Sequence, residues 1–314
     1  MDVVLIGVRA LHFAATVTVA GLLSFGCLIA GPAGARSLAD GGRFRRQLSA
    51  LLWASLGLAL ISGVAWLLVL SAGLVKETTI EALSEGVPWT VLAETRFGHA
   101  WSARFAMAGL IAAAALRFDI VAAPSSWRRR AGALLLGAGF VGLLASSGHA
   151  GATGGVLGAV HWTADALHLI AAAAWLGGLV PLVLLLAAAS RAGNETAAQI
   201  ADRATRRFSV LGIVAVATIV ATGGVNAVVL VGGLPALVAS DYGRVLLIKI
   251  AVFAIMLALA ADNRLRLSPR IREVPFMRRL ALNALAEVWL GLVVIVIVSV
   301  LGTLVPGTHL HHVH

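Results

Sequence analysis

Residues 159–189 read AVHWTADALHLIAAAAWLGGLVPLVLLLAAA. Asp165 is the only formally charged residue in this stretch, and most of the others are apolar. A helix needs about 20 apolar residues to cross the roughly 30 Å hydrocarbon core of a bilayer. The stretch is long enough for this and predicts a membrane-spanning helix.

Similar stretches lie on both sides of it. We predict eight transmembrane helices, at residues 4–30, 48–73, 98–117, 131–148, 159–189, 208–232, 243–261 and 281–305. The composition agrees, because 60% of the 314 residues are hydrophobic and only 12% are charged, against about 25% charged in a typical soluble domain. The links between the helices are short. We therefore expect an all-α polytopic membrane protein that lacks a soluble catalytic domain and is not an enzyme.

The net charge of +10 is distributed unevenly along the chain. Eighteen of the 24 Lys and Arg residues fall in four links, at 31–47, 117–130, 190–207 and 262–280. These links alternate along the chain with links that are acidic or nearly uncharged. Because basic loops remain in the cytoplasm, we predict that the four links are cytoplasmic and that both termini are external. The basic charge is then a topology signal, and we expect no nucleic-acid partner.

Several classes of site are excluded by composition. The single cysteine, Cys27, cannot form an intramolecular disulfide or a thiolate cluster. Only four methionines are present, too few for a relay of thioether ligands. The chain also has no Gly-rich phosphate loop between a strand and a helix, which argues against a nucleotide-driven pump.

The two halves of the chain resemble each other. Two matches carry the alignment: residues 11–21 with 167–177, and residues 97–106 with 242–251. Each half holds four predicted helices, an even number, so both halves enter the membrane in the same orientation. We predict two parallel four-helix repeats, 1–155 and 156–306, related by a pseudo-two-fold axis along the membrane normal. A His-rich external tail, 307–314, follows them.

Histidine carries the functional signal. All nine histidines fall in predicted external links or in the outer halves of predicted helices, and none lies on the basic side. This asymmetry indicates metal or proton chemistry on the external face. The tail sequence HLHHVH is a metal trap by composition alone, and its role, like that of His99, is left open.

The densest group of candidate ligands lies in and before the fifth predicted helix. At 100° per residue, His161, Asp165 and His168 share one helix face. His161 and His168 are about 10 Å apart along the axis, too far to bind one ion, whereas Asp165 and His168 can share one. His12 lies at a comparable depth and is the repeat partner of His168. We predict a deep metal site formed by His12, Asp165 and His168, with His149 and His161 at its entry.

Charged residues within predicted helices are also candidates, because an ionisable group inside a membrane is costly and usually functional. They are Arg9, Arg104, Asp165, Lys249 and Glu287. A structural alternative for Asp165 is an ion pair with Arg9 or Lys249 that holds the two halves together. For the two deep histidines the structural alternative is a hydrogen bond between helices.

Two other function classes fit part of the pattern. Two histidines on facing helices at similar depth are what bis-His ligation of haem b requires, so His12 and His168 also suit an electron-transfer protein. Asp165 is less natural beside such a haem. A third alternative is a structural assembly factor whose metal site is vestigial.

The run from Asp165 to Leu182, which includes His168, Trp175 and Pro181, resembles the signature of the copper resistance protein D (CopD) family. Further along, Lys249, the pair Asn263-Arg264 and Glu287 in the last helix are similar to the C-terminal pattern of that family. Leu11-His12-Phe13 in the first helix fits it too, so the resemblance spans nearly the whole chain.

The resemblance implies a bacterial inner-membrane protein that receives copper on the periplasmic side, with a small periplasmic copper carrier as its partner. The residues that map onto the shared motif are His12, His149, Asp165, His168, Trp175, Lys249 and Glu287. We take Arg9, Trp175, Lys249 and Glu287 as supporting residues of the site. Imidazole and carboxylate without thiolate suit Cu(II), or Cu(I) bound by two histidines.

Overall fold

The computed structural model describes residues 3–30, 41–76, 78–118, 120–121, 126–148, 151 and 154–308. Within these residues every regular element is a helix, as the sequence predicts. In chain order they are α1 (Val3–Ser24), η1 (Phe25–Ala30), α3 (Gly41–Val75), α4 (Thr79–Ser84), α5 (Val87–Glu94), α6 (Arg96–Arg117), α7 (Trp127–Gly142), η2 (Leu143–Ser147), α9 (Gly155–Ala172), η3 (Ala173–Gly177), α10 (Gly178–Ala192), α11 (Glu195–Val231), α12 (Leu234–Ala239), α13 (Asp241–Asp262), η4 (Asn263–Leu267), η5 (Ser268–Arg270) and α14 (Val274–Leu301).

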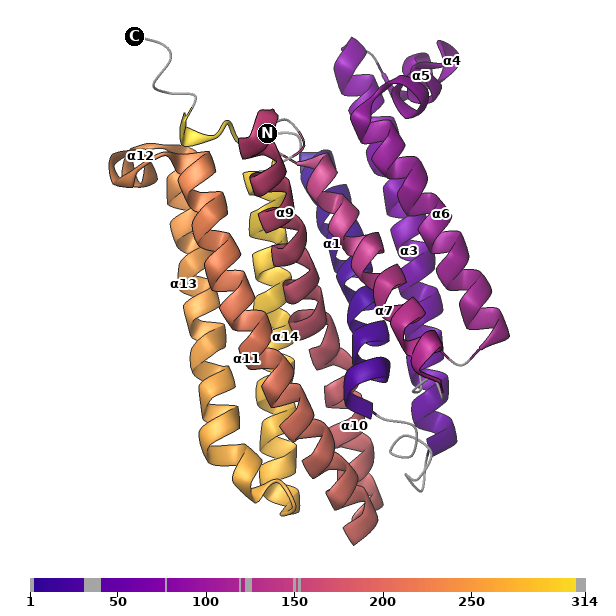
Figure 1. Cartoon of the computed structure of the whole chain (residues 1–314), viewed down its shortest axis with the longest axis vertical. Coiled ribbons are helices and arrows are strands. Elements are labelled where there is room, and N and C mark those ends of the chain that lie inside the picture. The colour runs from indigo at the N-terminus through magenta and orange to yellow at the C-terminus, as the bar shows by residue number, and fades with distance from the viewer. Residues whose placement is uncertain are drawn as a thin grey trace.

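Seven helices of the described chain are long and apolar enough to cross a membrane. They are Val3–Ala30, Gly42–Val75, Trp127–Ser147, Gly155–Ala192, Glu195–Val231, Asp241–Arg270 and Val274–Leu301. The remaining predicted span, 98–117, is the helix α6, which has 22 residues. Arg104 and His99 make its composition more polar than that of the seven, although it runs beside α3 and α7 (Figure 1).

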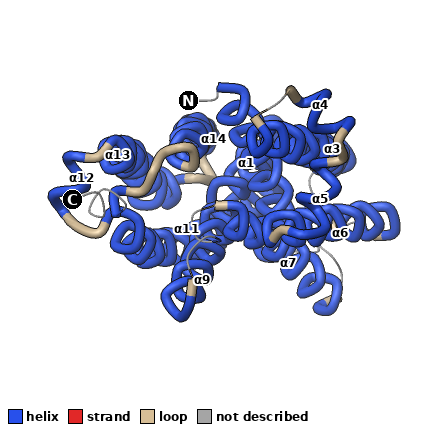
Figure 2. The backbone as a smooth tube through the Cα atoms, turned by 90° about the horizontal axis from the view of Figure 1, so that it is seen from above, coloured by secondary structure: helices blue, strands red, loops and turns tan. Residues whose placement is uncertain are grey.

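The long helices form one elongated bundle with α1 near its centre (Figures 1 and 2). α1 packs against α3, α7, α10 and α14 and is the most buried of the seven candidate spans. The first turns of α1 and the end of α14 meet at one end of the bundle, where Arg9 donates a hydrogen bond to the Gly302 carbonyl (3.4 Å).

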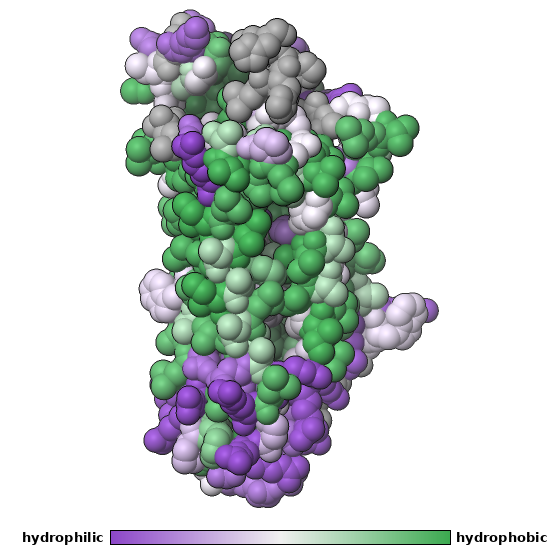
Figure 3. Space-filling view, turned by 90° about the vertical axis from the view of Figure 1, so that its left-hand side faces the viewer, coloured by the Kyte–Doolittle hydropathy of each residue, from purple (hydrophilic) through white to green (hydrophobic). Residues whose placement is uncertain are grey.

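The basic links gather at the opposite end of the bundle. Arg272, in the link between η5 and α14, pairs with Asp202 near the start of α11 (3.3 Å). Arg207 of α11 in turn donates to the Ile29 carbonyl of η1 (3.2 Å). These contacts place the end of η1, in the first half of the chain, beside basic residues of the second half at the same end. On the face drawn in Figure 3, a hydrophilic zone at this end gives way to a broad apolar belt, as expected for a protein that spans a bilayer.

A close helix crossing joins the two halves. Gly21 of α1 lies against the backbone of Gly177, and a Cβ atom on either glycine would overlap the backbone of the other helix. Small residues allow this approach between membrane helices. Gly177 ends the π-helical turn η3, four residues before Pro181 in α10. Because Pro181 has no N–H to donate to the Gly177 carbonyl and its ring crowds that carbonyl, the helix widens there.

A side chain at this crossing should weaken the fold. We expect Gly21→Leu to lower the free energy of unfolding by about 1–3 kcal/mol or more, since overpacking a close contact forces the two helices apart. Gly7→Leu is the matched control, because a Cβ at Gly7 in the same helix would meet no atom within 4 Å. Thermal unfolding in detergent measures the difference. Equal melting temperatures for the two variants would contradict a tight crossing.

Candidate metal site

His168 is held in one orientation by a neighbouring helix. Its Nδ1 lies 3.1 Å from the Thr222 hydroxyl of α11. That hydroxyl donates its own proton to the Thr218 carbonyl (2.6 Å), so toward the imidazole it acts as an acceptor. His168 therefore carries its proton on Nδ1, and the lone pair of Nε2 is left for another partner.

Polar groups from three helices form a cluster that includes this imidazole. Asp165 lies one turn earlier on α9, and its Oδ1 accepts a hydrogen bond from the Asn226 amide of α11 (3.1 Å). Lys249 of α13 interacts electrostatically with both Asp165 and His168. The amide oxygen of Asn226 is buried and has no hydrogen-bond partner. The second half thus assembles an imidazole, a carboxylate, an amide oxygen and one ammonium group.

His12 has a similar setting in the first half, with one difference. Its Nδ1 lies 3.1 Å from the Ser62 hydroxyl of α3, which donates to the Leu58 carbonyl (2.6 Å). By the same reasoning, His12 carries its proton on Nδ1. Its Nε2, however, accepts a hydrogen bond from the guanidinium of Arg104 in α6 (2.6 Å). Both ring nitrogens of His12 are therefore occupied.

Arg104 is fixed in this position by several contacts. It is only 2% exposed, and it also donates to the Thr16 hydroxyl (3.2 Å) and to the Phe140 carbonyl. Two indoles, Trp66 and Trp101, pack against the His12 ring with centroid distances of 5.6 and 5.1 Å. The surroundings of His12 are thus an aromatic cluster with a buried guanidinium.

The net charge differs between the surroundings of the two histidines. Arg9 lies over the ring of Trp66 (4.8 Å to the centroid), so a second guanidinium adjoins the aromatic cluster around His12. No carboxylate contacts His12 within the described residues. Around His168 the charges of Asp165 and Lys249 compensate each other. A metal cation is therefore repelled near His12 and tolerated near His168.

The predicted ligands are brought together only in part. Asp165 and His168 lie in one polar cluster, whereas the hydrogen-bond and ring partners of His12 all belong to the first half. The described part of the chain contains no group of three or more His, Cys, Asp or Glu residues placed to hold one ion. His161 is buried, at 1% exposure, one turn before Asp165. His149 lies outside the described residues.

The predicted supporting residues have separate settings. Of the two cations proposed as partners of Asp165, Lys249 lies near it, whereas Arg9 contacts the aromatic cluster and the Gly302 carbonyl. Trp175 packs against Phe253 with ring centroids 6.0 Å apart. Glu287 is 1% exposed in α14 and accepts a hydrogen bond from Asn263 (2.7 Å), nearer the basic end. His99 contacts only its local backbone, at the Ala93 carbonyl (2.8 Å).

Sequence reasoning missed the residues that orient the histidines. Ser62, Thr222 and Asn226 were not among the predicted site residues. The available signal was the helical spacing of Thr222 and Asn226, which are four residues apart on one face of α11 and therefore reach neighbouring positions on α9.

Two protein-family models match the chain. The model described as copper resistance protein D matches residues 202–301, and that described as copper resistance protein D-like, N-terminal domain, matches residues 1–159. The chain belongs to the copper resistance protein D family. The resemblance inferred from the sequence motifs is confirmed, and with seven candidate spans this CopD-family chain is a multi-pass membrane protein.

Individual relatives of this CopD-family chain cover much of its length. It is 33% identical over 309 residues to the inner membrane protein YebZ of Escherichia coli, and the alignment covers 96% of this chain and 98% of YebZ. It is 32% identical over 233 residues to copper resistance protein D of Pseudomonas syringae pv. tomato, with 71% of this chain and 73% of the relative covered. It is 29% identical over 276 residues to the copper transport protein CutJ of Bacillus subtilis, with 83% of this chain and 46% of the relative covered. No solved structure matches the chain.

Proposed function

We propose that this protein binds copper at its outer end within the bacterial inner membrane, and moves it inward or passes it to a partner. The relatives named for copper resistance, copper transport and the inner membrane support the class of function. The observation that carries the proposal is the orientation of His168, whose Nδ1 faces the Thr222 hydroxyl so that the Nε2 lone pair is left for a metal. Asp165 lies one turn earlier on the same helix. A small periplasmic copper carrier is the expected donor.

The chemistry of the cluster suits copper. Metal-binding histidines commonly donate their other ring N–H to a fixed acceptor, which sets the tautomer and orients the ring. Thr222 has this role for His168. Asp165 adds a carboxylate, and the amide oxygen of Asn226, which accepts no hydrogen bond, is a further ligand atom for a metal. Nitrogen and oxygen donors without thiolate bind Cu(II) strongly, since copper heads the affinity order of divalent metals for such ligands.

Lys249 is the counter-charge of this cluster when copper is absent. A carboxylate inside a membrane is costly unless it is paired. Lys249 is the cation whose charge acts on Asp165. Copper would replace the ammonium charge as the partner of Asp165. The site is therefore stable without metal and binds metal in competition with Lys249.

His12 has a structural role in this proposal. Arg104 already occupies its Nε2, and both Arg9 and Arg104 lie on the surrounding aromatic cluster. The deep copper site is then centred on His168 and Asp165, with His161 and His149 as entry ligands. The haem alternative is disfavoured for the same reason, because bis-His ligation needs the second nitrogen of both histidines.

We also propose that the chain crosses the membrane eight times as two parallel repeats, 1–155 and 156–306, with both termini external. Two local motifs support the repeat. His12 and His168 both contact a hydroxyl of the following long helix. The helices α6 and α13 both begin with a hydroxyl cap, at Thr95 and Ser240, that accepts from the glycine N–H three residues later (2.9 and 3.0 Å).

The proposed function predicts one copper ion per chain. The protein is purified in detergent after the tail histidines His309, His311, His312 and His314 are replaced by alanine, which removes adventitious binding. Elemental analysis should find copper near one per chain after loading and washing, without iron. Iron at one per chain with a haem absorption spectrum would favour the haem alternative. The absence of both copper and iron would contradict a defined metal site.

A further inference from the structure

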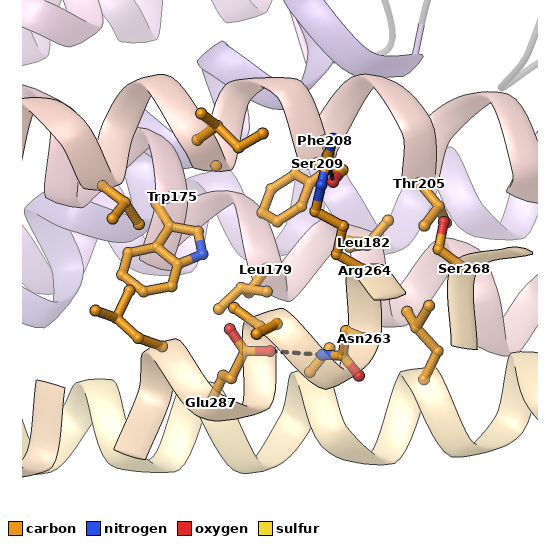
Figure 4. Close-up of a pocket in the computed structure, with 18 of the residues that line it drawn as sticks. Trp175, Leu179, Leu182, Thr205, Phe208, Ser209, Asn263, Arg264, Ser268 and Glu287 are labelled. Atoms are coloured by element: carbon orange, nitrogen blue, oxygen red, sulfur yellow. Dashed lines mark hydrogen bonds between the residues drawn. The ribbon is translucent and has the colours of Figure 1, made fainter. Parts of the chain in front are cut away.

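A cavity lies nearer the basic end of the bundle, and His168 is not among the residues that line it. It has a volume of about 390 Å³ and is lined by residues of η3, α10, α11, α14, the end of α13, η4 and η5. Trp175 and Leu179 line one end of it, Thr205 and Ser268 line the other, and Leu182 lies between them beside Arg264 (Figure 4). The hydroxyl groups of the lining thus lie toward the basic end of the bundle, whereas its carboxylate, Glu287, lies nearer Trp175 (Figure 4).

The polar end offers hydrogen-bond donors that the protein does not use. The Thr205 hydroxyl is buried, in a residue that is 5% exposed, and has no hydrogen-bond partner. Arg264 lines the same cavity and is bonded to Ser209 through one of its nitrogens. Ser268 adds another hydroxyl. Two hydroxyls and a guanidinium at one end of a cavity match the oxygens of a phosphate group.

The cavity also adjoins the lipid-facing surface. α10 packs against both α11 and α14, and α14 packs against α13. The cavity is lined by all four of these helices. Ile213 of α11 lines it and is 51% exposed. Among the candidate spans, those containing α11 and α13 are the least buried. An acyl chain in the bilayer can therefore enter from the side.

We propose that this cavity binds one anionic phospholipid from the leaflet at the basic end. Its acyl chain lies along Trp175 and Leu179, and its phosphate contacts Arg264 and the Thr205 hydroxyl. Glu287 is the one carboxylate among the residues that line the cavity, and it accepts a hydrogen bond from the Asn263 amide (2.7 Å). It lies nearer Trp175 than Ser268 (Figure 4). The proposal does not depend on copper binding.

Quenching of Trp175 fluorescence by brominated lipids tests this proposal. The full-length protein is placed in phosphatidylcholine nanodiscs that contain an equal, small fraction of brominated phosphatidylglycerol or brominated phosphatidylcholine. The signal of Trp175 is obtained as the difference between the native protein and Trp175→Phe. We expect stronger quenching by the anionic lipid, and Arg264→Gln should reduce this preference about fivefold, the contribution of one arginine near an anionic surface.

Matched variants separate the cavity from the general surface. Gly212 lines the cavity and a Cβ there would meet no atom within 4 Å, so Gly212→Leu should fill the space and protect Trp175. Gly224→Leu, on the same helix and equally open, lies outside the cavity and should leave the quenching unchanged. Arg278→Gln, which removes an arginine at the same end that bonds Ser190, should keep the lipid preference.

Three results would overturn the proposal. They are equal quenching by the two lipids, quenching that Gly212→Leu leaves unchanged, and quenching of Trp175 by a short-chain quinone but by neither lipid. The last result would assign the cavity to a different amphiphile. None of them bears on copper content, so a failure here is distinguishable from a failure of the proposed function.

Discussion

Replacing His168 by alanine is expected to weaken copper binding by more than about 100-fold, because the variant loses a direct ligand and even the loss of a group that only orients a ligand costs about 10- to 100-fold. Replacing His12 by alanine should leave the copper in place. That variant should instead lose about 2–5 kcal/mol of stability, since the buried Arg104 loses a charge-assisted hydrogen bond and a cavity forms beside Trp66 and Trp101.

Copper titration and thermal unfolding of both variants measure these two effects. Thr222→Val is an intermediate control, because it keeps the imidazole but removes the acceptor that orients it. Its copper affinity should fall about 10- to 100-fold. Loss of copper in His12→Ala with an unchanged melting temperature would show that the two histidines have been assigned the wrong roles.

Asp165 and Lys249 should have opposite effects on copper affinity. Asp165→Asn removes the carboxylate and should weaken copper binding about 10- to 100-fold. Lys249→Met removes the ammonium group that competes with the metal, and should strengthen binding about tenfold, a typical effect of one nearby charge. The copper-free Lys249→Met protein should also be less stable, because Asp165 then lacks its counter-charge, and copper should restore its melting temperature.

Lys249→Arg is the control for this pair, since it keeps a positive charge at the same position. Its copper affinity should remain within a few-fold of the native value. Isothermal titration in detergent with the tail histidines replaced measures all three variants. Weaker binding in Lys249→Met than in the native protein would contradict competition and would indicate that Lys249 supports the metal site directly.

The sequence predicted the helices and the grouping of the basic links for simple physical reasons. Apolar stretches longer than a bilayer allow little besides a helix, and the alternation of arginine-rich links places them at one end. The span 98–117 was predicted with the others, but α6 is not among the seven candidate spans, and Arg104 and His99 lower its hydropathy. Only the structure shows why an arginine is accommodated inside α6: Arg104 donates hydrogen bonds to His12, to the Thr16 hydroxyl and to the Phe140 carbonyl.

The candidate site was predictable only as far as one helix. Helical spacing alone placed Asp165 and His168 together, since residues three apart share a face. It could not show that Ser62, Arg104, Trp66 and Trp101 surround His12, because these contacts depend on how α1 packs against α3 and α6. Nor could it show that Thr222 fixes the proton of His168 on Nδ1, since this depends on a hydroxyl 54 residues away.

X-ray absorption at the copper edge of the copper-loaded protein tests the central claim most directly, because it detects imidazole ligands in either oxidation state. Spectra are compared for the native chain, His12→Ala and His168→Ala, all with the tail histidines replaced. We predict the scattering pattern of a bound imidazole in the native protein and in His12→Ala, and its loss, with the copper, in His168→Ala. An imidazole signal that persists in His168→Ala would contradict copper binding through His168.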